Sequence, residues 1–144
     1  MSRPIKFRGQ PIDGSGWVYG YYVYTFEIGY YSQGHTDVPP RLHYIFGDSG
    51  DYCEVKAETV GQYTGLNDRN GKEIYDRHKV KFKRFTNEYI GVVHFEKGCF
   101  VVKWESVVGS YNEKASHSVY LKDCENIEII GDEFHFLKGE DNNA

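Results

Sequence analysis

Residues 58 to 83 contain the clearest turn signal in the chain. An apolar and threonine-rich run, Thr59–Leu66, meets a polar cluster at 67–71, and the alternation of apolar with polar residues resumes at Ile74. Asn70-Gly71 within the cluster tolerates positive φ at both central positions of a turn, so it can join two strands without splaying them. This stretch therefore predicts a β-hairpin.

The composition favours strands over helices. Of the 144 residues, 17% are aromatic and 16 are glycine, a combination typical of β proteins with tight turns. Turn residues at 13–16 and at 96–98 predict two further hairpins. Their strands are Ile5–Arg8 with Trp17–Phe26, and Tyr89–Phe95 with Phe100–Glu105. The chain is predicted to be mainly β, built from antiparallel hairpins.

Five closely spaced strand patterns lie between Thr59 and Ile130. Short, turn-linked strands at this spacing predict a small SH3-like or partly open β-barrel in the C-terminal half. Val107–Ala115 is expected to be a loop, and Asn126–Ile130 the final strand. The length fits one continuous domain or two small lobes that share a core. The expected parts are an N-terminal β lobe (1–58), a barrel-like lobe (59–138) and a flexible tail (139–144).

The hairpin residues also carry a family resemblance. Thr64-Gly65-Leu66, Asp68, Asn70-Gly71-Lys72 and Ile74-Tyr75 form its core motif, and further matches lie at 6–9, 17–21, 59–63 and 129–132. In these residues the chain resembles the YopX-like family of bacteriophage and prophage proteins over nearly its whole length. The family has no established activity, so the resemblance implies a phage setting and a fold but no mechanism.

One position departs from the family pattern. After the Ile-Tyr pair, family members usually have an acidic residue, then Gly-Asp and an apolar pair, whereas this chain has Asp76-Arg77-His78-Lys79-Val80. Glycine permits a positive-φ turn that arginine adopts only at a cost. Either the local turn differs here, or this copy is divergent.

The cysteines and the amino terminus bear on the compartment. Cys53, Cys99 and Cys124 are odd in number and far apart, which argues against a disulfide framework or a zinc ribbon. The first residues lack the apolar run of a signal peptide, and no stretch approaches the ~20 apolar residues that span a bilayer. We expect a protein of the bacterial cytoplasm with no membrane contact and no cofactor.

Charge is unevenly distributed, although the net charge of −4 gives no general attraction to phosphate. Residues 77–84 hold five cations and no acid, and residues 123–133 hold five acids and no base. The cations are Arg77, Lys79, Lys81, Lys83 and Arg84. Alternate residues of a strand share a face, so the three lysines could contact a nucleic-acid backbone. Lysines also protect exposed edge strands without any ligand, and this simpler explanation is favoured.

The aromatic run Trp17–Phe26 is a second candidate surface. Core packing is the default explanation, because aromatic strands bury large areas. An excess of tyrosine also suits a protein interface, and together with Tyr30-Tyr31 these rings could stack on bases. The candidate interface residues are Trp17, Tyr19, Tyr21, Tyr22 and Tyr24.

Motifs for metal binding or catalysis are weak. The segment from Asp68 to Glu73 is too short for an EF-hand calcium loop, so Asp68 is expected to cap neighbouring amides. No nucleophile elbow, phosphate loop or adjacent Cys–His pair occurs, and His94 in an apolar strand is expected to be structural. A catalytic site would need residues distant in sequence. Its first candidates are His94, His78, Asp132 and Glu133.

These observations favour a non-catalytic accessory module that binds a protein partner or a second copy of itself. Nucleic-acid binding through residues 77–84 is the alternative, and an enzyme is the least favoured class.

Overall fold

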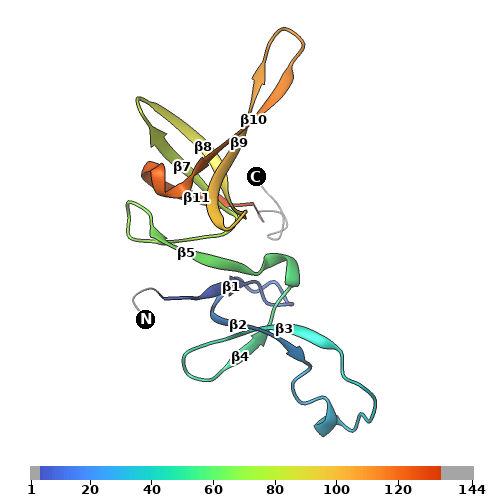
Figure 1. The fold of residues 1–144 in the computed structure, drawn as a ribbon. Coiled ribbons are helices and arrows are strands. Elements are labelled where there is room, and N and C mark those ends of the chain that lie inside the picture. Colours follow the sequence, from blue (N-terminus) through green and yellow to red (C-terminus); the bar gives the residue numbers. More distant parts are fainter. Residues whose placement is uncertain (1–3, 134–144) are drawn as a thin grey trace. The chain divides into compact units, whose positions relative to one another are not determined.

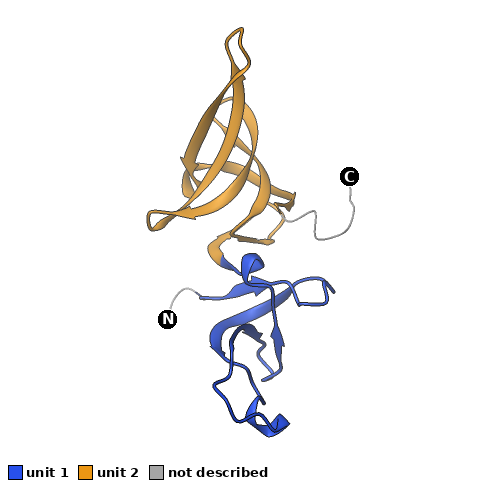
Figure 2. Cartoon of the chain, turned by 90° about the vertical axis from the view of Figure 1, so that its right-hand side faces the viewer, with its two compact units in different colours: residues 1–62 blue, residues 63–144 orange. Residues whose placement is uncertain are grey.

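The computed structural model describes residues 4–133, and the chain divides into two compact units, Met1–Gln62 and Tyr63–Ala144 (Figure 2). The strands are β1 (Phe7–Gly9), β2 (Val18–Phe26), β3 (Arg41–Phe46), β4 (Tyr52–Glu54), β5 (Gly61–Asn67), β6 (Glu73–Tyr75), β7 (His78–Arg84), β8 (Asn87–Glu96), β9 (Cys99–Val108), β10 (Glu113–Tyr120) and β11 (Glu125–Asp132). The short 3-10 helices are η1 (Tyr31–Gln33), η2 (Ala57–Thr59) and η3 (Leu121–Asp123). The predicted mainly β fold is confirmed. Within residues 4–133, no helix is long and apolar enough to cross a membrane.

The predicted division into lobes 1–58 and 59–138 stays a prediction. The predicted tail, 139–144, lies outside the described residues.

Unit 1 is an antiparallel sheet with the strand order β4-β3-β2-β1 (Figure 1). The predicted first hairpin forms, since Phe7 pairs with Gly20 and Gly9 pairs with Val18. Beyond β1, Phe7 also pairs with Gln62 at the start of β5. β2 lies between β1 and β3 and is therefore an internal strand.

Unit 2 contains a five-stranded antiparallel sheet in the order β10-β9-β8-β7-β11. Four strands follow one another as a meander, and β11 returns to pair with β7, so that the sheet curls into a partly open barrel (Figure 1). The predicted hairpin turn at 96–98 is present, with positive φ at both Lys97 and Gly98. This dihedral pattern matches the twist of the two flanking strands.

The predicted loop Val107–Ala115 is wrong. β9 continues to Val108 and β10 begins at Glu113, so the segment is the tip of a long hairpin. Gly109 and Asn112 have positive φ in its turn. The exposed, mixed sequence of this ribbon hid its pairing, because neither strand buries a regular apolar face here.

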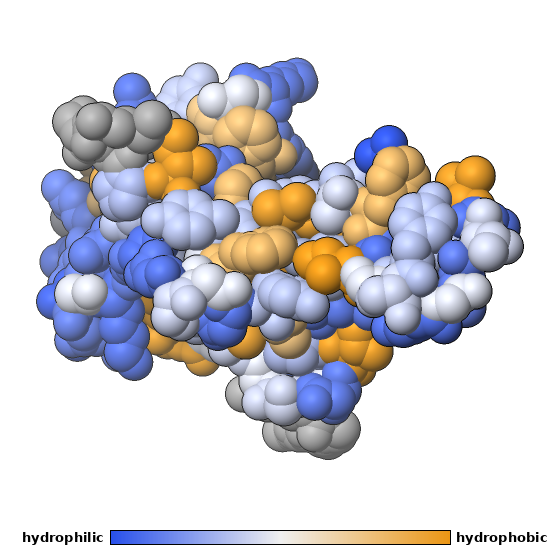
Figure 3. Space-filling view, turned by 90° about the horizontal axis from the view of Figure 1, so that it is seen from below, coloured by the Kyte–Doolittle hydropathy of each residue, from blue (hydrophilic) through white to orange (hydrophobic). Residues whose placement is uncertain are grey.

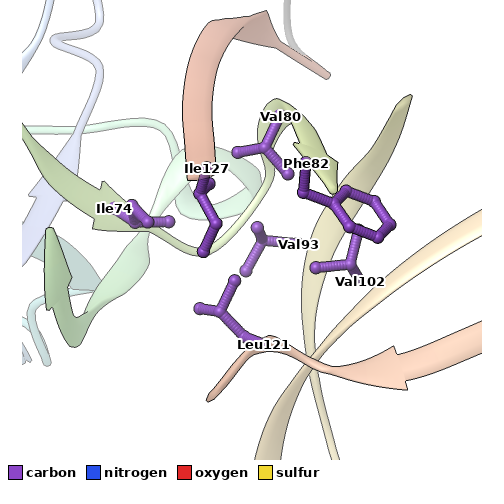
Figure 4. Close-up of a cluster of buried hydrophobic side chains, with 7 residues drawn as sticks. All are labelled: Ile74, Val80, Phe82, Val93, Val102, Leu121 and Ile127. Carbon is purple, nitrogen blue, oxygen red and sulfur yellow. The ribbon is translucent and has the colours of Figure 1, made fainter. Parts of the chain in front are cut away.

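The core of unit 2 gathers side chains from the concave side of the curled sheet and from the segments that cover it. Val80 and Phe82 alternate with lysines along β7, and Val93 and Val102 face them from β8 and β9. Ile74, Leu121 and Ile127 complete the cluster, in which all seven side chains point toward one another (Figure 4). Fully burying one such side chain contributes roughly 1.5–3 kcal/mol, so this cluster is the main stabilising feature of the unit.

Candidate functional site

The motif hairpin forms as predicted, but its turn differs in detail. Tyr63 of β5 pairs with Tyr75 of β6, and Asn67 pairs with Glu73. Gly71 has φ +83, whereas Asn70 is not in the positive-φ region, so the predicted two-residue turn is wrong. The strands are instead joined by a five-residue loop, closed by a 2.7 Å hydrogen bond from the Asp68 amide to the Lys72 carbonyl.

Asp68 organises this loop through its buried carboxylate. Oδ1 accepts hydrogen bonds from the amides of Asn70 and Lys72, both at 2.9 Å, and Oδ2 accepts one from Ile129 at 3.1 Å. Burial alone would raise the pKa of this carboxyl, but the amides of Ile129, Lys72 and Asn70 together hold the pKa below its usual value. The predicted capping role is confirmed, and the same carboxylate also fastens the motif to β11.

Arg77 explains the departure from the family pattern. It adopts φ +74, so the chain makes the positive-φ turn with arginine where glycine would be relaxed. Its amide donates to the Val93 carbonyl at 2.8 Å, and its guanidinium lies 3.1 Å from Glu133 Oε1. The amide of Glu133 donates to the Arg77 carbonyl at 3.0 Å. These contacts offset the local cost and tie the ends of β7, β8 and β11 together.

The four residues named as catalytic candidates come together near this turn. The Nε2 atom of His78 lies 3.9 Å from Asp132 Oδ1, and the Nε2 atom of His94 lies 4.0 Å from Glu133 Oε2. Pairing of β11 with β7 places Asp132 directly opposite His78.

The Nδ1 atom of His78 accepts a 2.8 Å hydrogen bond from the Tyr75 amide, which assigns the proton of the neutral ring to Nε2. The contacts of His78, His94, Asp132 and Glu133 therefore also hold the ends of β7, β8 and β11 together. Among the described residues, no group of three or more His, Cys, Asp or Glu side chains could hold a metal ion. Catalysis by this cluster remains a hypothesis.

The basic strand does not lie at a sheet edge, so the explanation of its lysines as edge protection is wrong. β7 pairs with β8 on one side and with β11 on the other. Lys79, Lys81 and Lys83 share the outward face, as the alternation predicts, while Val80 and Phe82 point into the core.

The five cations named as candidate nucleic-acid contacts do not form one surface. Arg84 lines a separate pocket with Val101 and Tyr120, and Arg77 turns toward Glu133. Acids also lie across the strand from two of the lysines, because Glu128 is the register partner of Lys81 and Glu125 that of Lys83. Much of the charge of this strand therefore has an opposite charge beside it within the sheet.

Unit 1 presents a continuous row of stacked side chains on one face of β1, β2 and β3. We call it the aromatic row. Its members, in spatial order, are Phe7, Tyr22, His43, Tyr24, Arg41 and Phe26. Successive ring or guanidinium centres are 5.5, 5.8, 4.5, 5.8 and 4.6 Å apart.

Strand register produces the aromatic row. Tyr24 pairs with His43 and Phe26 pairs with Arg41, so these side chains share one face across β2 and β3. The Tyr22 hydroxyl and His43 Nδ1 share a 2.6 Å hydrogen bond. Burial, and then the neighbouring Tyr24, raise the pKa of Tyr22, so its hydroxyl stays protonated in neutral solution.

The predicted interface aromatics divide between the two faces of the sheet. Tyr22 and Tyr24 belong to the aromatic row, whereas Tyr19 and Tyr21 alternate with them on the opposite face and are 50% and 55% exposed. The ring of Trp17 lies 3.8 Å from the Arg8 guanidinium, beside the start of β2. The aromatic row also contains Arg41 and His43 of β3. Their place in it depends on the register between β2 and β3, which the sequence pattern of a single strand does not reveal.

Comparison with known families places the chain. The model of the YopX protein family matches residues 6–135. The chain belongs to the YopX family. The resemblance carried by its hairpin motif is thereby confirmed, and the structure gives that YopX motif a physical role, since Asp68 fixes its loop to β11. No curated protein matches the chain.

Proposed function

We propose that this YopX-family chain is a phage or prophage accessory module of the bacterial cytoplasm. It catalyses no reaction, and it binds a protein partner or a second copy of itself through the aromatic row of unit 1. For unit 2 we propose an SH3-like arrangement, supported by the β7–β10 meander, the η3 turn and the return of β11 to β7.

Exposure of the aromatic row is the observation that carries the proposal. Tyr24 is 50% exposed and Phe26 is 44% exposed, although both lie in the middle strand of a sheet. An aromatic side chain presents roughly 150–250 Å², so the row and its neighbours place an apolar area of a few hundred Å² in water. Monomeric proteins rarely expose more than this in one patch.

The space-filling view agrees with a surface of mixed polarity. Apolar residues reach the surface between pale and blue residues on the face shown in Figure 3. Exposed tyrosine rings and an arginine stacked on a ring are typical of protein interfaces. The guanidinium of Arg41 has no ion-pair partner among the described residues, which leaves it available to a partner carboxylate.

The test compares a variant of the aromatic row with a matched control. Tyr24→Ser with Phe26→Ser removes two exposed rings from the row, and Tyr111→Ser with Phe85→Ser removes two exposed rings from turns of unit 2. Light scattering over a concentration series measures self-association, and quantitative affinity capture from host cells measures partner binding. We expect only the row variant to lose the association. A wild-type chain that stays monomeric and captures the same proteins as the row variant would refute the proposal.

Nucleic-acid binding is the rival, and the three lysines on the outer face of β7 support it. A gel shift with DNA and RNA at low and moderate salt tests it, because neutralised phosphates make binding fall with salt. Lys81→Glu would also place two acids opposite each other, so Lys81→Glu combined with Glu128→Lys restores the pair. Binding lost in both variants would favour nucleic acid. Binding recovered in the double variant would mean that the single change acted through the fold.

A further inference from the structure

A cavity of about 440 Å³ opens in unit 2 beside the motif that carries the family membership. Leu66, Phe100, Tyr120 and Leu121 supply its apolar lining, and Thr64, Cys99 and Lys122 also line it. Sites for small organic ligands are apolar hollows of roughly 300–1,000 Å³ with a few polar groups that fix orientation. The volume and the lining of this cavity fall within that description.

A bulge in β5 directs Leu66 to the cavity. The register between β5 and β6 shifts between Tyr63 and Asn67, Gly65 has φ +89, and the Leu66 amide donates to Thr64 Oγ1 at 3.2 Å. Leu66 is 39% exposed and lies outside the core cluster. Bulges re-aim side chains and are frequent beside binding sites. The Thr-Gly-Leu part of the motif therefore holds a leucine toward solvent, although core packing does not require it there.

Two aromatic rings add to the apolar lining, the exposed Tyr120 and Phe100, which is partly buried against the core cluster. Tyr120 ends β10 with 53% of its surface exposed. Phe100 packs on the exposed Phe95 at a centroid distance of 4.9 Å, which extends the apolar wall along β8 and β9. An apolar ligand body between Leu66, Phe100 and Tyr120 would remove all three surfaces from water.

The charge of Lys122, the one ionised side chain among the described residues of the lining, indicates the head group of the ligand. Lys122 Nζ lies 5.8 Å from the centre of the Tyr120 ring. Within the part of the chain that the structure describes, Lys122 takes part in no ion pair. An ammonium group beside an apolar hollow favours an anion that carries its charge at one end.

We propose that this cavity binds an amphipathic organic anion, with a compact aromatic or branched apolar body and one carboxylate or sulfonate group directed to Lys122. The site lies in unit 2, so it is independent of the protein-binding surface proposed for unit 1. Either proposal can fail while the other stands.

Two fluorescent probes that share their rings test the site. Anilinonaphthalene sulfonate carries an anionic head, and phenylnaphthylamine has the same apolar rings without it. Lys122→Met removes the charge and keeps the length of the side chain. We expect it to weaken the sulfonate probe about three- to fivefold, the range of an exposed ion pair, and to leave the neutral probe unchanged. Lys114→Met, at an exposed lysine paired with Glu105, is the control and should change neither probe.

Leu66→Ser should weaken both probes about five- to tenfold, because the apolar contact is common to them. Leu66 is exposed, so circular dichroism should show that the variant stays folded. Cys99 locates the bound probe, since occupancy should slow its alkylation while Cys53, in unit 1, reacts at an unchanged rate. Equal effects of Lys122→Met on both probes, or no effect on either, would overturn the proposal. An alkylation rate of Cys99 that is the same with and without the probe would also overturn it.

Discussion

Asp68→Asn tests whether the motif carboxylate stabilises unit 2. Asparagine keeps one acceptor oxygen for Asn70 and Lys72 but turns its NH₂ group toward the Ile129 amide, so that two donors face each other. Asp68 is 6% exposed, so water cannot replace the lost acceptor. A hydrogen bond to a charged group contributes about 1.5–3 kcal/mol, and an unsatisfied buried amide costs about 1–3 kcal/mol. Since these terms overlap, we expect the free energy of unfolding to fall by about 2–4 kcal/mol.

The loss should depend on pH with a definite sign. The folded-state pKa of Asp68 is lowered, so the carboxylate stabilises the protein above the unfolded pKa of about 3.9. That contribution is lost as the pH falls through the folded pKa, since a protonated carboxyl no longer accepts all three bonds. The difference in stability between wild type and Asp68→Asn should therefore be full at neutral pH and shrink below about pH 4.

Urea unfolding followed by Trp104 fluorescence measures this difference, because Trp104 packs against Phe82 of the core of unit 2. A Trp17→Phe background removes the only other tryptophan. Glu96→Gln is the matched control within unit 2, since Glu96 Oε2 accepts a hydrogen bond from Lys103 Nζ and both side chains are partly exposed. Its loss should be much smaller. An equal loss in both variants, or a loss at Asp68 that stays constant between pH 7 and pH 3, would refute the reasoning.

Three further substitutions or reactions have defined outcomes. Arg77→Gly and Arg77→Ala both remove the ion pair with Glu133, so they differ only in the backbone strain at φ +74. In urea unfolding we expect the glycine variant to be more stable than the alanine variant by about 1 kcal/mol, and equal stability would argue against strain. Gly91→Ala would put a Cβ atom 2.7 Å from the Lys103 carbonyl oxygen. Calorimetry should show that the free energy of unfolding falls by about 1–3 kcal/mol, whereas unchanged stability would mean that the strands can separate there. Burial raises the pKa of Cys124 to about 11, against the opposing effect of Arg84. Alkylation of this thiol at pH 8 should therefore be far slower in the folded chain than in urea, and similar rates would contradict the burial.

Local turn chemistry made much of the fold predictable. The hairpins at 13–16, 67–71 and 96–98 follow from residues that accept positive φ or cap amides, and each signal lies within a few positions of sequence. The β9–β10 ribbon was missed because its exposed tip has no apolar alternation to mark the strands. Its register runs without a break from Glu113 opposite Val108, beside the turn, to Tyr120 opposite Val101.

The candidate sites were predictable only in part, because they depend on register between strands. Alternation along β2 separates Tyr19 and Tyr21 from Tyr22 and Tyr24, but the sequence run presents them as one group. His43 joins the row through its pairing with Tyr24, which no pattern within one strand reveals.

Long-range pairing also resolves the uneven charge of the sequence. The basic stretch 77–84 and the acidic stretch 123–133 are segregated along the chain, yet β7 and β11 are neighbours in the sheet and bring the two stretches side by side. Lys81 then faces Glu128, and Asp68 and Arg69 of the motif loop bond to the same strand. Because the final strand adds to the sheet from far away in sequence, complementary charge on β7 and β11 favours the correct partner and register. Complementary charge across the register therefore accounts for Lys81 and Lys83 without any ligand. Only a loss of nucleic-acid binding that persists when opposite charges are restored at positions 81 and 128 would give the lysines a second role.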